Sequence, residues 1–333
     1  MIPETYRALV AEETGRNVIR PKVLDKEFSS LPAGEVLIRV HYSSLNYKDA
    51  LSATGNRGIT RNYPHTPGID ASGTVIYSAE QSVHKGDQVL VCGYDLGMNT
   101  PGGFGQYIQV PAAWVMPLPD GLGLRESMML GTAGFTAALA IFQMELNGQK
   151  PGNGPVLVTG AGGGLGSLAI NILSQQGYKV IASTGKTSET AYFSKLGASE
   201  MLTRENVDDR SGKLLLRPRW AGAIDTVGGN ILSTAIRACS RHGNIAVCGN
   251  ANSYEFSTTV YPFILNGVNL LGIDSATCPM ELRRLVWEKL ADDWRPPLLK
   301  EISREISMTD LPEHINLILN GKIRGRVFVN MEA

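Results

Sequence analysis

Apolar residues in the first third of the chain alternate with polar ones at the two-residue period of a β-strand. Residues 36–42 and 68–76 show this alternation, and residues 87–92 and 104–110 repeat it between turns that contain Gly or Pro. Successive side chains of a strand face opposite sides of a sheet, so the period predicts half-buried strands. Short strands at this spacing are typical of a small twisted barrel, and we expect a mostly β, barrel-like domain over residues 1–128.

From residue 129 to residue 272 the pattern changes to short apolar strands that alternate with helices. Strand-like runs at residues 156–159, 178–183 and 244–248 are separated by helical stretches such as residues 165–176. This rhythm predicts an α/β domain with a doubly wound parallel (Rossmann) sheet, covered by helices on both faces.

The last part of the chain, residues 273–333, holds two helical patterns and a final strand at residues 325–330. This segment is short for an independent domain, so we expect it to return to the β-rich domain and pack on it. The apolar run just before it, residues 268–274, predicts a strand at an edge of the parallel sheet. Exposed edge backbone invites pairing with a second subunit, which favours a homodimer.

Composition narrows the function classes. The chain has 333 residues, of which 43% are hydrophobic and 19% charged, and Lys+Arg and Asp+Glu number 31 each. Zero net charge offers no basic field for nucleic acid or an anionic membrane. The N-terminus lacks the pattern of a signal peptide, and no apolar stretch approaches the ~18 residues of a membrane span. The four cysteines are scattered and suggest reduced thiols, so we expect a cytoplasmic protein.

Metal and hydrolase motifs are missing. The five histidines show no H-E-x-x-H spacing, and the C-x-x-H pair of Cys239 and His242 has no second pair. Neither a G-x-S-x-G elbow nor a Walker lysine is present. We therefore expect no metal site.

The strand at residues 156–159 ends in a glycine-rich turn that opens a helix. Ala161, Gly163 and Gly166 stand at the positions of a dinucleotide-binding fingerprint, with Ala in place of the first Gly. Gly163 would let the backbone approach a pyrophosphate, and Gly166 would let the helix pack closely on the strand. The N–H groups at the helix start attract phosphate, so the turn predicts a dinucleotide site. The alternative is a tight turn without a ligand.

The residues after the second strand of this domain favour NADPH over NADH. An NAD site usually carries Asp or Glu there, where the ribose 2′-hydroxyl binds. This chain has Ser183, Thr184 and Lys186 instead, a combination that suits a 2′-phosphate, and Arg204 after the presumed third strand adds a second cation. Alternatively, Ser183 and Thr184 only cap the following helix.

Four stretches resemble one known family: residues 43–51 (SSLNYKDAL), 67–75 (PGIDASGTV), 131–137 (GTAGFTA) and 220–228 (WAGAIDTVG). With the layout of the whole chain, they are similar to the zinc-free medium-chain dehydrogenase/reductase superfamily, in its acryloyl-CoA reductase and quinone-oxidoreductase-like branch. The resemblance implies a GroES-like barrel domain, a Rossmann cofactor domain, NADPH as reductant and, usually, a dimer.

The chain departs from the zinc alcohol dehydrogenases of that superfamily. Those enzymes carry a Cys ligand where this chain has Asn46, and Gly-His-Glu where it has residues 68–70 (GID). The four-cysteine structural zinc lobe is missing too. The resemblance therefore implies a reductase without zinc.

The resemblance also implies which residues contact NADPH, and the glycine and second-strand patterns add Gly166 and Ser183. The full set is Tyr47, Gly162, Gly163, Gly164, Leu165, Gly166, Ser183, Thr184, Gly185, Lys186, Arg204, Asn250 and Arg324.

The reaction implied by the resemblance is hydride transfer from NADPH to the β-carbon of a short α,β-unsaturated acyl-CoA such as acryloyl-CoA. Backbone amides or the Asn46 amide could donate to the enolate oxygen that forms. Tyr47 could orient the cofactor or protonate the α-carbon, although solvent could do the latter. Asp49 could hold a neighbouring group or only cap the short helix. Arg57 and Arg61 could meet the CoA phosphates or merely solvate their loop.

Two other functions are compatible with these residues. A quinone oxidoreductase would stack a flat aromatic acceptor over the nicotinamide and would need no site for CoA phosphates. An NADPH-binding protein without turnover would keep the cofactor site alone.

Overall fold

The computed structural model describes residues 3–16 and 18–333, except the side chain of residue 187. The chain forms two compact units. The first unit comprises the residues up to Thr132 together with Ala276–Ala291 and Ser303–Ala333. The second unit comprises Ala133–Ser275 and Asp292–Ile302.

A mainly antiparallel sheet of seven strands forms the first unit, in the order β14-β15-β3-β4-β5-β7, with β6 also paired to β3. A separate hairpin precedes it. The strands are β1 (Thr5–Gly15) and β2 (Val18–Glu27) of the hairpin, then β3 (Val36–Leu45), β4 (Asp70–Ser78), β5 (Gln88–Cys92), β6 (Tyr107–Val110), β7 (Met116–Pro117), β14 (Ser303–Ser307) and β15 (Arg326–Asn330). The unit confirms the expected β-rich domain.

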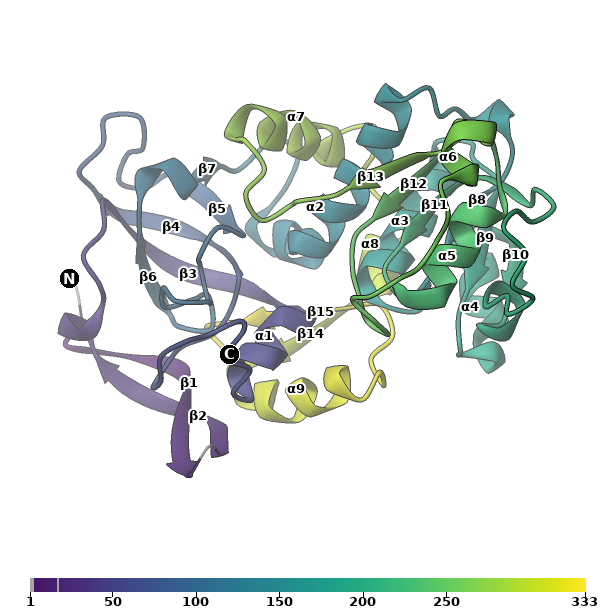
Figure 1. Ribbon diagram of the computed structural model, residues 1–333. Helices are drawn as coiled ribbons and strands as arrows, with labels where there is room; N and C mark the ends of the chain where they lie inside the picture. Colours follow the sequence, from purple (N-terminus) through teal and green to yellow (C-terminus); the bar gives the residue numbers. More distant parts are fainter. Residues whose placement is uncertain (1–2, 17) are drawn as a thin grey trace. The chain divides into compact units, whose positions relative to one another are not determined.

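The core of the first unit joins the two ends of the chain. Val36 of β3 and Val327 of β15 belong to one buried apolar cluster, together with Ile315 of α9 (Leu311–Leu319). Strand β15 pairs antiparallel with β3, so the final strand lies inside the sheet (Figure 1). The other helices of this unit are α1 (Tyr47–Ala53) and α7 (Met280–Ala291).

Six parallel strands form the sheet of the second unit, in the order β10-β9-β8-β11-β12-β13. The chain enters near the middle of the sheet and winds outward in both directions, which is the Rossmann order and confirms the expected fold class. The strands are β8 (Val156–Val158), β9 (Val180–Ser183), β10 (Ala198–Leu202), β11 (Trp220–Asp225), β12 (Cys239–Val247) and β13 (Asn269–Gly272).

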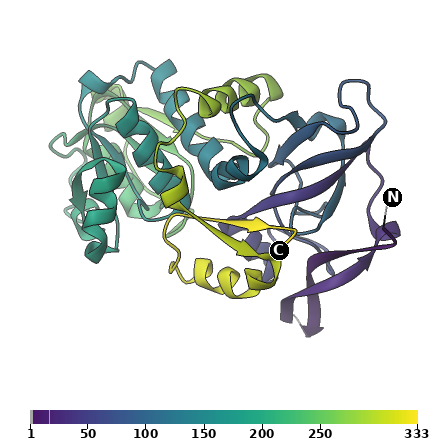
Figure 2. The same cartoon turned by 180° about the vertical axis from the view of Figure 1, so that it is seen from behind.

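Helices cover both faces of the parallel sheet. The two opposite views show α5 on one face and α3 and α4 on the other (Figures 1 and 2). The helices of this unit are α3 (Gly164–Gln175), α4 (Thr190–Leu196), α5 (Gly229–Arg237), α6 (Tyr261–Asn266) and α8 (Leu299–Ile302). Apolar side chains of β8, β11 and α5 meet in one buried cluster, for example Leu157, Ala223 and Leu232.

The C-terminal segment is divided between the units. Within the second unit, Gln176 Nε2 donates to the Asp293 carbonyl at 2.8 Å, and the Leu298 amide donates to Asn171 Oδ1 at 3.1 Å. These bonds attach residues 292–302 to α3 and the turn after it. The segments on either side of them belong to the first unit.

Helix α2 (Leu124–Leu146) crosses the boundary between the units. Among the described helices, it alone has the length and composition of a membrane span. However, 83% of its apolar window is buried inside the protein, as in a core helix. The helix is also broken at Gly131, whose φ of 51° and ψ of −157° are not helical.

Candidate functional site

The glycine turn lies between β8 and α3. Gly163 precedes α3 as its N-cap, and Gly164 is its first residue. A Cβ on Gly166 would lie 2.6 Å from the Gly160 carbonyl oxygen and 2.7 Å from Ala161 Cα, so only glycine lets the helix approach the turn this closely. No side chain in the described part of the chain caps α3, which leaves the first N–H groups of the helix able to bind an anion.

Lys186, after β9, approaches this turn, and Arg204, after β10, lies beside Gly185. A Cβ on Gly162 would lie 3.2 Å from Lys186 Cδ, and a Cβ on Gly185 would lie 2.9 Å from Arg204 Cζ. The hydroxyl of Thr184 accepts a hydrogen bond from the Lys186 amide at 3.0 Å. The arrangement has the cations and donors that a phosphate monoester requires.

The other residues expected to contact the cofactor differ in how far they are exposed. Ser183 is only 2% exposed, and its carbonyl accepts a hydrogen bond from the Ala161 amide at 3.1 Å, so it supports the turn through its backbone. Leu165 is half-buried in the first turn of α3, and Asn250 is exposed in the loop after β12. Arg324 is exposed just before β15 in the first unit.

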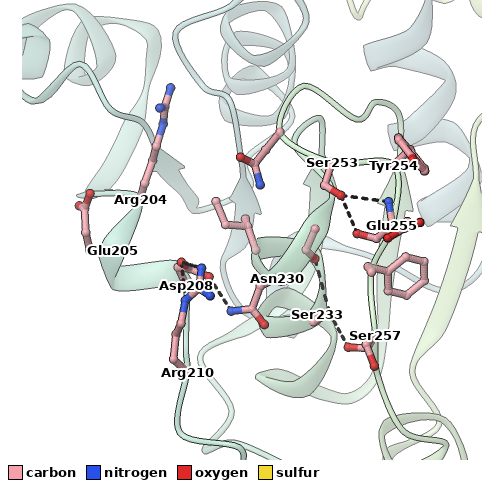
Figure 3. A pocket seen from close by; sticks show the side chains of 14 residues that line it. Arg204, Glu205, Asp208, Arg210, Asn230, Ser233, Ser253, Tyr254, Glu255 and Ser257 are labelled. Atoms are coloured by element: carbon pink, nitrogen blue, oxygen red, sulfur yellow. Dashed lines mark hydrogen bonds and ion pairs between the residues drawn. The ribbon is translucent and has the colours of Figure 1, made fainter.

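A hollow of about 850 Å³ opens beside Arg204, where β10, β11 and β12 end (Figure 3). On its wall Asp208 accepts hydrogen bonds from Asn230 Nδ2 at 2.5 Å and from Arg210 Nη2 at 2.7 Å. Figure 3 shows the Arg204 side chain pointing away from Asp208, Arg210 and Asn230. The guanidinium of Arg204 lies beside Gly185 instead. Ligands of open parallel sheets bind at the carboxyl ends of the strands, where this hollow lies.

Asn46 and Asp49 form the polar start of α1 in the first unit. Asp49 Oδ2 accepts hydrogen bonds from the Asn46 amide N–H at 2.8 Å and from Asn46 Nδ2 at 3.1 Å, and Asp49 Oδ1 accepts one from the Ile69 amide at 2.8 Å. Asp49 is fully buried, and these bonds support the helix-cap alternative for it. Tyr47, the first residue of α1, has a side chain that is 45% exposed.

Asp70, the first residue of β4, is the centre of a buried polar cluster. Its carboxylate accepts hydrogen bonds from Ser44 Oγ, from Asn46 Nδ2 at 2.8 Å, and from the hydroxyl of Thr132 at 2.6 Å. The Asn46 amide group thus donates to two carboxylates within the protein. Contact between the same group and an enolate would require one of these bonds to break.

Glycine at position 131 makes this cluster possible. A Cβ there would lie 2.6 Å from Ser44 Oγ, 2.7 Å from Asp70 Oδ2 and 2.8 Å from Arg326 Nη2. Its positive φ breaks α2, so that a new helical segment begins at Thr132 with its N–H directed at the Asp70 carboxylate.

Arg326 supplies the positive charge of the cluster from the first position of β15. It is only 3% exposed, and Nη1 donates to Asn46 Oδ1 at 3.1 Å and to the Leu45 carbonyl at 3.3 Å. Burial lowers the pKa of Arg326, while Asp70 and Asp49 raise it. Burial raises the pKa of Asp49 to about 7, the charge of Asp70 adds to this, and the N–H donors of Asn46 and Ile69 act against it.

Arg57 and Arg61 lie in an exposed loop of the first unit. Arg57 Nη1 donates to the Arg61 carbonyl at 2.6 Å, its Nη2 lies 3.7 Å from Glu13, and its guanidinium stands 4.8 Å from the centre of the Tyr63 ring. Arg57 is therefore already engaged within the protein.

Four members of the buried cluster were not identified by the sequence patterns: Ser44, Asp70, Thr132 and Arg326. The first three lie within stretches that carry the family resemblance, so their position in the sequence offered a signal. Arg326 offered a weaker signal, as a charged residue directly before the apolar residues 327–329 of β15.

Two family models match this chain. Residues 32–120 match the family model described as "Alcohol dehydrogenase GroES-like domain", and residues 164–292 match the one described as "Zinc-binding dehydrogenase".

Individual relatives match over nearly the whole chain. A putative quinone oxidoreductase, YhfP of Bacillus subtilis, is 44% identical over 98% of this chain and 99% of its own, and its crystal structure with NAD bound matches with a TM-score of 0.96. An acrylyl-CoA reductase, AcuI of Ruegeria pomeroyi, is 41% identical over 98% of this chain and 100% of its own. The crystal structure of the yhdH oxidoreductase from Salmonella enterica with NADP matches with a TM-score of 0.95, at 40% identity, over 98% of this chain and 99% of that chain.

The residues of the buried cluster do not fit zinc, although one matching family is described as zinc-binding. Over residues 3–16 and 18–333, no group of three or more His, Cys, Asp or Glu is placed to hold a metal. The cluster offers an amide at Asn46, and the Arg326 guanidinium lies beside the Asp70 carboxylate, where it would repel a cation.

Proposed function

The chain belongs to the medium-chain dehydrogenase/reductase superfamily, in the acryloyl-CoA reductase and quinone-oxidoreductase-like branch, and we propose that it is a zinc-free, NADPH-dependent enoyl reductase. Its substrate in this proposal is a short α,β-unsaturated acyl-CoA such as acryloyl-CoA. The observation that carries the proposal is the 41% identity to an acrylyl-CoA reductase over 98% of this chain and all of that protein.

The NADPH site of the proposal is the glycine turn with its two cations. The pyrophosphate would bind the N–H groups at the start of α3, and the 2′-phosphate would bind Lys186 and Arg204. The hollow beside Arg204 would accept the adenine. Related structures with bound NADP and NADPH support NADPH as the reductant.

In the proposed reaction NADPH supplies the hydride that reduces the C=C bond. The chain must exclude water, orient the acyl group and donate hydrogen bonds to the thioester oxygen, where negative charge develops. Tyr47 is the group we assign to the reacting centre, because it is exposed at the first position of α1 while the side chains of Asn46 and Asp49 are bonded to other groups of the protein. The phenol would orient the cofactor or deliver a proton to the α-carbon.

For the CoA phosphates we propose Arg57 and Arg61, on the exposed loop after α1; Arg57 would exchange its exposed partner Glu13 for a phosphate. Replacing both by Ala should raise the KM for acryloyl-CoA and leave NADPH affinity unchanged, whereas Arg20→Ala, an exposed arginine on β2, should change neither. Equal effects on both ligands would remove the CoA assignment.

We further propose a homodimer that forms through β13. This strand is the last in the order of the described sheet, and exposed apolar residues surround it: Leu270 on the strand, with Ile264 and Leu265 on α6. Continuous pairing of two such edges would cover both the backbone groups and the apolar side chains. We place the protein in the cytoplasm, which suits its four free thiols.

The deciding experiment measures NADPH oxidation with acryloyl-CoA, with saturated propionyl-CoA as control and a panel of benzoquinones beside them. The proposal expects kcat/KM for acryloyl-CoA to exceed that for every quinone by at least about tenfold. The 44% identity to a putative quinone oxidoreductase makes quinone reduction the second candidate, and the opposite preference would establish it. NADPH binding without turnover of any acceptor would instead indicate a binding protein.

A further inference from the structure

The Asn46 side chain is held at both ends. Its oxygen accepts a hydrogen bond from Arg326 Nη1 at 3.1 Å, and its nitrogen donates to Asp70 at 2.8 Å and to Asp49 at 3.1 Å. An amide with charged partners at both ends cannot rotate without breaking a charge-assisted bond. The cluster therefore fixes the orientation of the residue that begins α1.

Arg326 joins β15 to two other segments of the first unit at this point. Besides Asn46, its Nη1 reaches the Leu45 carbonyl at the end of β3, and its Nε reaches the Met129 carbonyl in the first part of α2, each at 3.3 Å. A planar guanidinium can satisfy these acceptors together because its N–H groups diverge at fixed angles. Lysine carries the same charge but lacks this geometry.

Charge balance explains why an arginine stands here. Asp49 and Asp70 are both fully buried, and buried carboxylates are costly unless a cation or several N–H donors face them. Arg326 is the buried cation whose charge acts on both. The residues of this cluster do not fit zinc. Arg326 therefore supplies the positive charge that faces the two carboxylates.

Tyr47 follows Asn46 directly, and its direction depends on how α1 begins. The amides of Asp49 and Ala50 both donate to the Asn46 carbonyl, at 3.1 and 3.3 Å, which is the first turn of the helix. The Asn46 side chain is linked to this turn through Asp49, because Asp49 Oδ2 accepts hydrogen bonds from both Asn46 Nδ2, at 3.1 Å, and the Asn46 backbone N–H, at 2.8 Å. If the side chain of Asn46 turns away, this capping box weakens, and the start of α1 no longer holds Tyr47 in one direction.

We propose that Arg326 is a positioning residue, which acts through Asn46 to hold Tyr47 in the geometry that the reduction requires. The inference rests on the proposed function for its kinetic readout. It goes beyond that function by assigning to the final strand of the chain a role at the reacting centre.

A double-mutant cycle tests the link between Arg326 and Tyr47. Tyr47→Phe and Arg326→Lys should each lower kcat for acryloyl-CoA by about tenfold. The kcat of the double variant should be no more than about twofold lower than that of the less active single variant. Multiplying losses would mean that the two residues act independently and would overturn the proposal. An unchanged kcat in either single variant would overturn it as well. Arg304→Gln, an exposed arginine on the neighbouring strand β14, is the matched control and should leave kcat unchanged.

Hydrogen exchange provides a readout that does not depend on the substrate. In Arg326→Lys the amides of Asp49 and Ala50 should exchange at least about tenfold faster, while the amides of β15 keep their protection. Equal loosening of β15 would indicate a purely structural role and overturn the proposal, as would unchanged exchange in α1. If Arg326→Lys does not fold, Asn46→Ala takes its place, since it removes the link and leaves Arg326 bonded to two carbonyls. If the wild-type protein does not reduce acryloyl-CoA, the proposed function is wrong. The hydrogen-exchange rates of Asp49 and Ala50 in Arg326→Lys would still decide whether Arg326 holds the start of α1.

Discussion

Thr132 binds Asp70 twice, through its amide N–H at 2.9 Å and through its hydroxyl at 2.6 Å. The two residues are 62 positions apart in the sequence. Both hydrogen bonds form because α2 breaks at Gly131 and starts again at Thr132, whose N–H faces the carboxylate. A buried carboxylate thereby caps a helix that lies elsewhere in the chain.

Gly131→Ala should destabilise the protein by at least about 3 kcal/mol, because the new methyl group would meet the cluster and the positive φ would be strained. Its Cβ would lie within 2.8 Å of Ser44, Asp70 and Arg326. Urea denaturation monitored by circular dichroism measures the change.

The control for this substitution is Gly148→Ala. Gly148 also has a positive φ, of 81°, but no atom lies within 4 Å of its Cβ position, so we expect a loss of only about 1 kcal/mol. Similar losses in the two variants would show that the contacts around Gly131 contribute little.

Lys186→Ala should weaken NADPH binding by roughly tenfold or more and leave NADH binding unchanged, because a charge-assisted bond to the 2′-phosphate contributes about 1.5–3 kcal/mol. Arg204→Ala should behave in the same way. Titration calorimetry with both cofactors gives the two dissociation constants.

Lys179→Ala serves as the control for the cofactor prediction, since Lys179 is an exposed lysine just before the opposite end of β9. It should leave both affinities unchanged. If Lys186→Ala weakens NADPH and NADH equally, the residue does not read the 2′-phosphate.

Asp49 should make the stability of the protein depend on pH between about 4 and 7. The pKa of this carboxyl is about 7 in the folded chain, against an ordinary value of 3.8. Within this window the unfolded chain has released a proton that the folded chain retains, so stability falls as pH rises, by up to about 1.4 kcal/mol per pH unit. Above pH 7 both states are ionised and the dependence ends.

Comparison of wild type with Asp49→Asn isolates this effect, because other titrating groups are common to both. Between pH 5 and pH 7 the free energy of unfolding of the wild type should fall relative to that of the variant. Parallel curves would mean that Asp49 stays ionised, held by its N–H donors.

Leu270→Lys should convert the proposed dimer to a monomer, because it places a charge at the centre of the exposed edge of β13. Light scattering coupled to gel filtration measures the mass. Leu214→Lys, at another exposed leucine of the same unit, should leave the mass unchanged. A dimer that survives Leu270→Lys would exclude this edge as the interface.

Local patterns predicted most elements of the fold. The expected strand at residues 156–159 corresponds to β8, the expected helix at 165–176 to α3, and the final strand at 325–330 to β15. Side-chain period and glycine placement act over a few residues, so they can be read without the fold. The strands of the hairpin, β1 and β2, were not predicted individually. No residue of β2 is fully buried, so its sequence lacks the clear apolar alternation that marks a half-buried strand.

The sequence alone determined the glycine turn, the cations after β9 and β10, and the family, since each of these depends on residues that are close together or on a stretch that can be compared directly. Only the tertiary structure decided that Asn46 is held by Arg326, that Asp70 caps a helix beginning at Thr132, and that Asp49 is buried beside a second carboxylate. These contacts join residues up to 280 positions apart. Their existence depends on strand order and on a helix break at one glycine, which no local pattern contains.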